Sequence, residues 1–150
     1  MNTPRHVYEV YIRTSPERLW QAITDPALTK QYFYQGSVRS DWKVGAPIEH
    51  VMPDGSIALK GTILELVPQR RLVHTFIMEH DDEGRLDRPS RVTWEIVPRG
   101  DVCQLTVTHD DFDAETPTFQ KVRRGWNPVL SGLKTMLETG KPLVIGPAAS

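Results

Sequence analysis

Apolar and polar residues alternate along the first segment, 6–13. Tyr8 and Ile12 share one face of this segment, and a period of two with β-branched and aromatic side chains predicts a strand with one solvated face. The pattern then changes, because Ser15 followed by Pro16 is typical of a helix N-cap and a first helical residue. A helix is therefore expected directly after the first strand.

A second helix start follows the first one. Asp25 and Pro26 repeat the signal of an N-cap residue followed by proline, so the first helix must end near Thr24. The second helix is short and is expected to end at about Phe33, because Gly36 and the segment after it carry turn and strand signals.

The middle of the chain predicts a β-meander. Short alternating segments are separated by clusters of Pro, Gly, Asp and Ser. Gly61 stands inside one of these segments, which suggests a bulge or a close backbone approach there. The expected strands cover residues 37–41, 47–52, 57–67, 71–79, 91–97 and 102–109.

The last amphipathic segment predicts a long helix. Its apolar residues recur at three- and four-residue steps, as a helix with one buried stripe requires: Phe119, Val122, Trp126, Leu130, Leu133 and Leu137. Gly140 followed by Pro142 predicts the end of this helix. Pro128 lacks an amide donor and crowds the preceding turn, so we expect a kink or a restart near Asn127. Residues 141–150 are expected to form a loose tail.

Together these elements predict one α+β domain over residues 1–150, with its core at about 6–140. An antiparallel sheet of about seven strands cannot leave its apolar face open, and the C-terminal helix is the long amphipathic element that can cover it. The two short helices after the first strand can close one end. This arrangement is a curved sheet wrapped around a helix, with space between them for a cavity.

Composition narrows the classes of function. The 150 residues carry 18 Lys and Arg against 19 Asp and Glu, which argues against nucleic-acid binding because phosphate contacts need clustered cations. The lone Cys103 excludes an internal disulfide and a multi-cysteine zinc motif. No apolar run is long enough to span a membrane, and the N-terminus shows no secretory signal. We therefore expect a soluble protein of the cytoplasm.

Several sequence blocks follow one another in a specific order and spacing. They are 15–26, 41–45, 61–65 with Pro68, 71–76, 90–95, 105–109, and 125–126 with Leu130 and residues 133–140. Taken together, they resemble the START-like (SRPBCC) superfamily, in the branch homologous to the heat-shock-protein-90 ATPase activator. The resemblance implies the helix-grip fold. It also implies a hydrophobic cavity under the long helix, which the superfamily uses for lipids, sterols, polyketides and other apolar ligands.

The expected function is binding of a small apolar or amphipathic ligand in this cavity, as a carrier, a sensor or a sequestering protein. Ligand pockets are mostly apolar with a few polar anchors. The candidate ligand-binding residues are Tyr32, Trp42, His50, Met52, His74, Phe76, Trp94, His109, Phe112, Trp126 and Leu130. Phe33 and Met78 are further candidates of the same kind. Core packing is the alternative interpretation throughout, and it is favoured for Trp94.

Signals for metal binding and catalysis are sparse. The histidines stand at single strand positions without the spacing of metal ligands, so no metal and no cofactor are expected. Cys103 and His109 lie roughly 20 Å apart along one strand at ~3.3 Å per residue, which is too far for a catalytic pair. No nucleophile elbow, phosphate loop or dinucleotide fingerprint is present. The sequence favours a non-enzymatic role, and a cyclase-like or hydrolase-like cavity enzyme stays open.

A cochaperone-type interaction domain is the alternative function. The sequence resembles the C-terminal-type domain of the chaperone activator, and we expect no separate N-terminal module, which weakens this alternative. Lys121, Arg123 and Arg124 form a small basic patch, which is usually a solvated helix face. The expected partner is an apolar small molecule. A chaperone and a second copy of the chain in a homodimer remain alternatives.

Overall fold

The computed structural model describes residues 4–149. Their order along the chain is a strand, two short helices, six further strands and a long helix, with one short 3-10 turn before the sixth strand. The elements are β1 (His6–Ile12), α1 (Pro16–Thr24), α2 (Pro26–Tyr32), β2 (Ser37–Ser40), β3 (Pro47–Val51), β4 (Ile57–Val67), β5 (Arg71–Phe76), the 3-10 turn (Gly84–Leu86), β6 (Ser90–Arg99), β7 (Val102–Asp110) and α3 (Pro117–Thr139).

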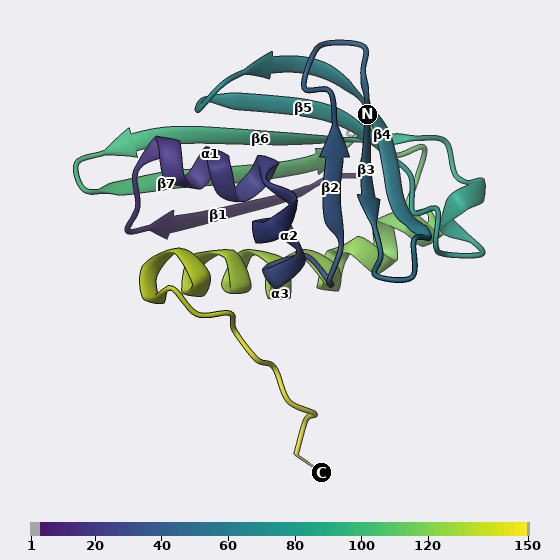
Figure 1. The fold of residues 1–150 in the computed structure, drawn as a ribbon. Coiled ribbons are helices and arrows are strands. Elements are labelled where there is room, and N and C mark those ends of the chain that lie inside the picture. The colour runs from purple at the N-terminus through teal and green to yellow at the C-terminus, as the bar shows by residue number, and fades with distance from the viewer. Residues whose placement is uncertain (1–3, 150) are drawn as a thin grey trace.

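All seven strands form one antiparallel sheet in the order β1-β7-β6-β5-β4-β3-β2. The sheet curves around α3, which runs beneath its concave face (Figure 1). Helices α1 and α2 pack against β2 and α3 at one end. This is the helix-grip architecture that the sequence predicts, and it is confirmed.

The strand phases place the core between the sheet and the helices. On β7, Cys103, Leu105 and Val107 are fully buried, and the residues between them are half exposed. The apolar stripe of α3 meets this face, with Leu133 fully buried. Burying each such aliphatic side chain contributes about 1.5–3 kcal/mol, so the sheet and α3 stabilise one another.

The cap residues that the sequence predicts lie at the helix ends. The hydroxyl of Ser15 accepts a hydrogen bond from the Arg18 amide at 3.2 Å, and the carboxylate of Asp25 accepts one from the Ala27 amide at 2.8 Å. Gly140 adopts the left-handed conformation, with φ of 77°, that ends α3. Beyond it, residues 141–149 form neither helix nor strand and lead away from the sheet and helices (Figure 1).

Two sequence expectations need correction. The strand expected over 71–79 ends at Phe76, because continuous backbone pairing with the neighbouring strands stops there. After Phe76, Ile77 forms only an isolated bridge with Lys60. The long helix does not restart near Asn127, because α3 continues through Pro128 as one helix. The hydroxyl of Tyr34 bonds the Gly125 carbonyl just before that proline, so tertiary contacts hold the turn in place.

No helix among residues 4–149 combines the length and the apolarity that crossing a membrane requires.

Candidate ligand-binding cavity

A cavity of about 360 Å³ lies between the first half of α3 and the part of the sheet that curves over it. Its wall is mostly apolar and aromatic. The side chains and backbone that line it come from α3, the α2–β2 connection, β3 and β4, and the end of β5 with the residues after it: Phe33, Tyr34, Gly36, His50, Met52, Ala58, Leu59, Phe76, Met78, His80, Asp81, Lys121, Val122, Gly125, Trp126 and Val129.

Helical spacing sets the α3 wall of the cavity. Val122, Trp126 and Val129 lie four and three residues apart, so they share the face that looks toward the sheet. Gly125 stands on the same side and has no side chain to fill the space. A Cβ atom at Gly125 would lie 3.6 Å from the hydroxyl oxygen of Tyr34.

The α2–β2 connection forms one rim. Tyr34 and Gln35 both adopt positive φ angles, 50° and 65°, which non-glycine residues rarely do. The Tyr34 hydroxyl donates to the Gly125 carbonyl at 2.6 Å and ties this strained segment to α3. A Cβ atom at Gly36 would lie 3.2 Å from the Cβ of His50, so the glycine lets the backbone pass close to that ring.

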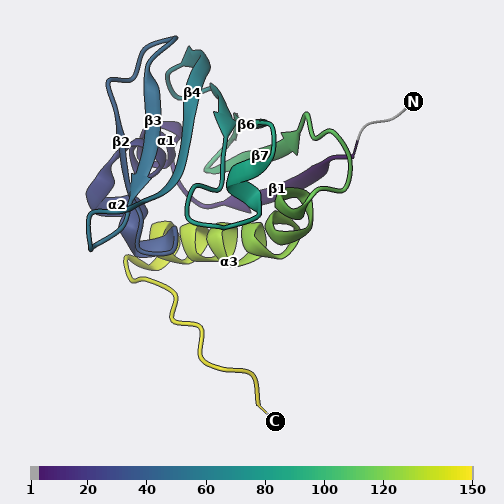
Figure 2. The same cartoon turned by 90° about the vertical axis from the view of Figure 1, so that its right-hand side faces the viewer.

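The connection after β5 forms the opposite rim. In Figure 2 this teal segment lies beside α3, between β4 and β7. The ammonium of Lys121 bonds both carboxylate oxygens of Asp81, at 2.7 and 2.8 Å, and a carboxylate oxygen of Glu83 at 3.3 Å. This contact lowers the pKa of Asp81 and raises the pKa of Lys121, so both groups stay charged at neutral pH.

Two buried histidines behind the cavity are fixed by tryptophan. The indole of Trp94 donates to Nε2 of His74 at 3.2 Å, and Nδ1 of His74 lies 2.8 Å from the Thr75 carbonyl. The indole of Trp126 donates to Nδ1 of His109 at 3.0 Å. Because an indole only donates, each accepting nitrogen must be unprotonated. Burial lowers the pKa of His74 to about 4 and that of His109 well below its usual value, so both rings are neutral.

His50 has a different environment. Its ring lies against Phe33, with 4.3 Å between the ring centroids, and it lines the cavity. Its Nδ1 is closed off from solvent and has no hydrogen-bond partner within residues 4–149. Burial, and next the proximity of His74, lower the pKa of His50 to about 3. The cavity wall therefore contains a neutral imidazole with unused hydrogen-bonding capacity.

The structure brings six of the candidate residues into the main cavity wall: Phe33, His50, Met52, Phe76, Met78 and Trp126. His74 and Trp94 bond one another just behind it, around a space of about 10 Å³ that also touches His50, Phe76 and Trp126.

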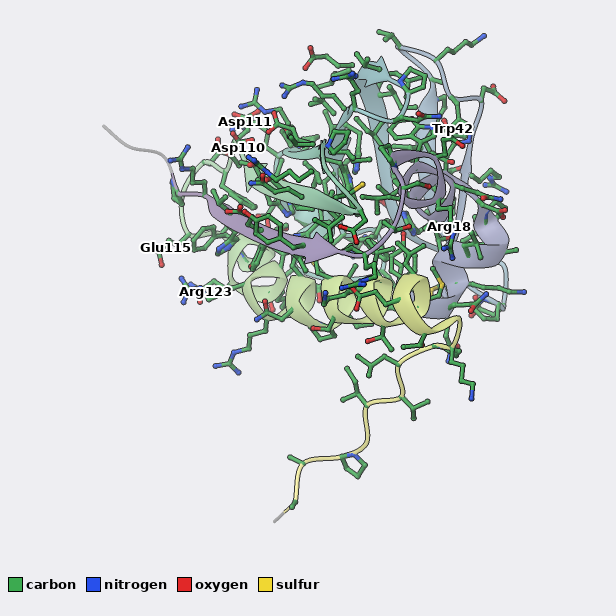
Figure 3. All side chains as sticks on the ribbon, turned by 90° about the vertical axis from the view of Figure 1, so that its left-hand side faces the viewer. Arg18, Trp42, Asp110, Asp111, Glu115 and Arg123 are labelled. Carbon is green, nitrogen blue, oxygen red and sulfur yellow. The ribbon has the colours of Figure 1, made fainter. Side chains whose placement is uncertain are left out.

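The other five candidates lie outside the cavity. Tyr32 is buried and donates its hydroxyl to the Ala22 carbonyl at 2.8 Å. His109 uses both ring nitrogens, since Nδ1 accepts from Trp126 and Nε2 lies 2.7 Å from the Ser90 hydroxyl. The ring of Phe112 packs against the His109 ring, with 4.8 Å between the ring centroids. Leu130 is buried in the core. Trp42 lies beyond α1, away from α3 (Figure 3). These five residues contribute to packing, whereas the sequence predicts that they contact a ligand.

Part of the wall has a sequence signal that the candidate set does not use. Val122 and Val129 lie four residues before and three residues after Trp126, so helical spacing places them on the same face of α3. Tyr34, Ala58 and Asp81 have no comparable signal, because loop and strand ends set their positions.

Within residues 4–149, no three or more His, Cys, Asp and Glu side chains gather closely enough to hold a metal ion.

Solved structures share this architecture at low sequence identity. A Mesorhizobium loti protein is 22% identical, with a TM-score of 0.75 over 89% of this chain and 96% of that one. The Aha1 dimer from Colwellia psychrerythraea is 18% identical, with a TM-score of 0.74 over 93% and 99%. An HSP90 activator from Plasmodium falciparum is 21% identical, with a TM-score of 0.73 over 89% and 95%. These likenesses establish the fold.

No curated protein matches the sequence. One family model does, and it is described as Activator of Hsp90 ATPase homolog 1-like protein. The match spans residues 13–138, from the end of β1 to the last turn of α3, and so includes both rims and all walls of the cavity. The chain therefore belongs to the family of Activator of Hsp90 ATPase homolog 1-like proteins.

Proposed function

We propose that this protein binds a small, mostly apolar molecule in the cavity under α3, as a carrier, a sensor or a sequestering protein. The observation that carries the proposal is the cavity of about 360 Å³. Protein interiors are close-packed and leave few voids larger than a water molecule. A space of this size falls within the range of ligand pockets, about 300–1,000 Å³.

The chemistry of the wall supports an apolar ligand. Phe33, Phe76 and Trp126 present aromatic surface, and Met52 and Met78 add flexible thioethers that adapt to an irregular shape. The lone Cys103 is free and buried, which agrees with the reducing cytoplasm that we propose as its compartment.

A cavity-filling substitution tests the proposal. Ala58 on β4 is half-buried and lines the cavity, so Ala58→Phe fills the space without deleting a wall contact. We expect wild-type protein to bind the uncharged probe 9-ethylanthracene with quenching of tryptophan fluorescence, since Trp126 stands in the wall. The variant should bind about tenfold more weakly or worse.

The control is Leu64→Phe, at an exposed position of the same strand, which should bind like wild type. Equal binding by the two variants, or no binding by the wild type, would contradict the proposal.

A cochaperone role is the second candidate. The family description and the Plasmodium neighbour, an HSP90 activator, favour it, and the Colwellia neighbour, described as a dimer, favours a homodimer within it. The matching experiment adds the protein, up to saturation, to the heat-shock-protein-90 chaperone of its own host and measures ATP turnover. Under this candidate, turnover rises in both wild type and Ala58→Phe, because the cavity takes no part. Unchanged turnover with wild type rejects it.

A further inference from the structure

His50 is the polar group of the cavity wall whose hydrogen bonds are unmet. Among residues 4–149, His74 and His109 use both ring nitrogens, whereas neither nitrogen of His50 has a partner. Nδ1 is the buried nitrogen, whereas Nε2 makes no hydrogen bond within residues 4–149 and is therefore free to bond something that enters the cavity.

The geometry of the ring shows which nitrogen is available. A Cβ atom at Gly36 would lie 3.2 Å from the Cβ and 3.4 Å from the Nδ1 of His50, so this edge of the ring is packed against the glycine. Nε2 lies on the opposite edge, and it is not closed off from solvent as Nδ1 is. Because His50 lines the cavity, Nε2 is the nitrogen that an occupant of the cavity can reach.

The same packing sets the position of the proton. A neutral imidazole carries one N–H group, and a buried N–H without an acceptor is rarer and less favourable than an unpaired acceptor. The closed-off Nδ1 is therefore the unprotonated nitrogen, and Nε2 carries the hydrogen. His50 accordingly offers a hydrogen-bond donor to the cavity.

The charges of the rim disfavour acidic occupants. The charged side chains among the described wall residues are Asp81 and Lys121, and Lys121 is already bonded to Asp81 and to Glu83. The three groups sum to a net charge of −1, and no unpaired cation faces the cavity in the part of the chain that the structure describes. A carboxylate that entered would lose hydration without gaining a counter-ion.

We propose that the cavity selects uncharged ligands that carry a hydrogen-bond acceptor, such as a carbonyl or ether oxygen on an apolar or aromatic body, and that the Nε2–H of His50 donates to this oxygen. The inference rests on the proposed ligand-binding function and adds the chemical class of the ligand. It distinguishes this cavity from one built for fatty acids or other organic anions.

Three matched anthracene probes test the inference. They are 9-acetylanthracene with a neutral acceptor, 9-ethylanthracene without one, and anthracene-9-carboxylate with a negative charge. Binding to wild type is followed by quenching of tryptophan fluorescence at pH 7.5. We expect the acetyl probe to bind about three- to tenfold more tightly than the ethyl probe, the range that one net hydrogen bond gives, and the carboxylate to bind weakest.

Variants at position 50 identify the donor. His50→Phe should bring the ratio of acetyl to ethyl binding close to one, whereas His50→Gln, which keeps an N–H donor, should retain a preference. Leu64→Phe is the control, because Leu64 is exposed on β4 and lies outside the cavity, and it should behave like wild type. Where His50→Phe folds poorly, His50→Leu is a second variant without a donor, and it too should bring this ratio close to one.

The outcomes separate the two proposals. Binding of the ethyl probe without any preference for the acetyl probe, or tightest binding of the carboxylate, overturns the inference and leaves the cavity function standing. A preference for the acetyl probe that survives unchanged in His50→Phe overturns the role of His50. Failure of all three probes to bind overturns both the inference and the proposed function.

Discussion

At the scale of single residues, three histidines on β3, β5 and β7, which alternate with other strands in the sheet, take different roles because of one or two contacts each. The alternation of β7 predicts an inward-facing His109, and the structure buries it completely. Alternation cannot predict that the indole of Trp126, on α3, donates a hydrogen bond to Nδ1 of His109. His50 is the reverse case, since its strand position was predictable but its unmet hydrogen bonds depend on Gly36 and Phe33 around it.

These histidines make stability depend on pH. The pKa values of His50 and His74 fall to about 3 and about 4 in the folded chain, from about 6.5 when unfolded. Above pH 6.5 both states hold neutral rings, and as the pH falls below 6.5 only the unfolded state gains protons. The free energy of unfolding should therefore decrease between pH 6.5 and 4, by up to about 1.4 kcal/mol per pH unit for each such histidine.

Urea unfolding at pH 7.5, 6.5, 5.5 and 5.0 measures this dependence. The variant His50→Phe removes one of the buried histidines without breaking a protein hydrogen bond, so its stability should change less steeply with pH than that of wild type. Leu64→Phe, an exposed substitution that removes no titratable group, should keep the wild-type slope. An identical slope in His50→Phe would mean that His50 titrates normally in the folded protein.

At the scale of elements, the hydrophobic pattern predicts which strands and helices form, and long-range contacts shape the cavity between them. Helical spacing from Trp126 identifies Val122 and Val129 of the α3 wall. The bond between Tyr34 and Gly125 joins residues 91 positions apart and depends on a positive φ angle, and no local pattern signals either feature. The same contact lies beside Pro128, where the sequence predicts a kink or a restart and α3 continues as one helix without a restart.

A substitution at Gly61 tests how closely β4 and β5 pack. A Cβ atom there would overlap the Thr75 carbonyl oxygen, in line with the close approach that the sequence suggests. Since this oxygen belongs to the backbone of β5, Gly61→Ala forces β4 and β5 apart and should lower the free energy of unfolding by about 1–3 kcal/mol or more. Gly146→Ala, at a position with nothing within 4 Å, is the control and should unfold like wild type. Equal midpoints for the two variants would show that β4 and β5 have room for a side chain.

At the scale of the whole molecule, the fold could be predicted because one sheet needs one long helix to cover it. Whether the space beneath the helix is packed or hollow could not be predicted, because it depends on how far the sheet curves away from α3 (Figure 2). Leu130 shares α3 with Trp126 and Val129, which line the cavity, and still lies in the core. Small differences in the direction of side chains on one helix decide whether a residue packs in the core or lines the cavity.

A crystal structure of the wild-type protein with 9-acetylanthracene would show whether an uncharged molecule with an acceptor oxygen binds in the cavity. We predict that the probe lies in the cavity against Trp126, with its carbonyl oxygen about 3 Å from Nε2 of His50. A saturated protein with the probe bound elsewhere, or a cavity filled by its own side chains, would contradict the account.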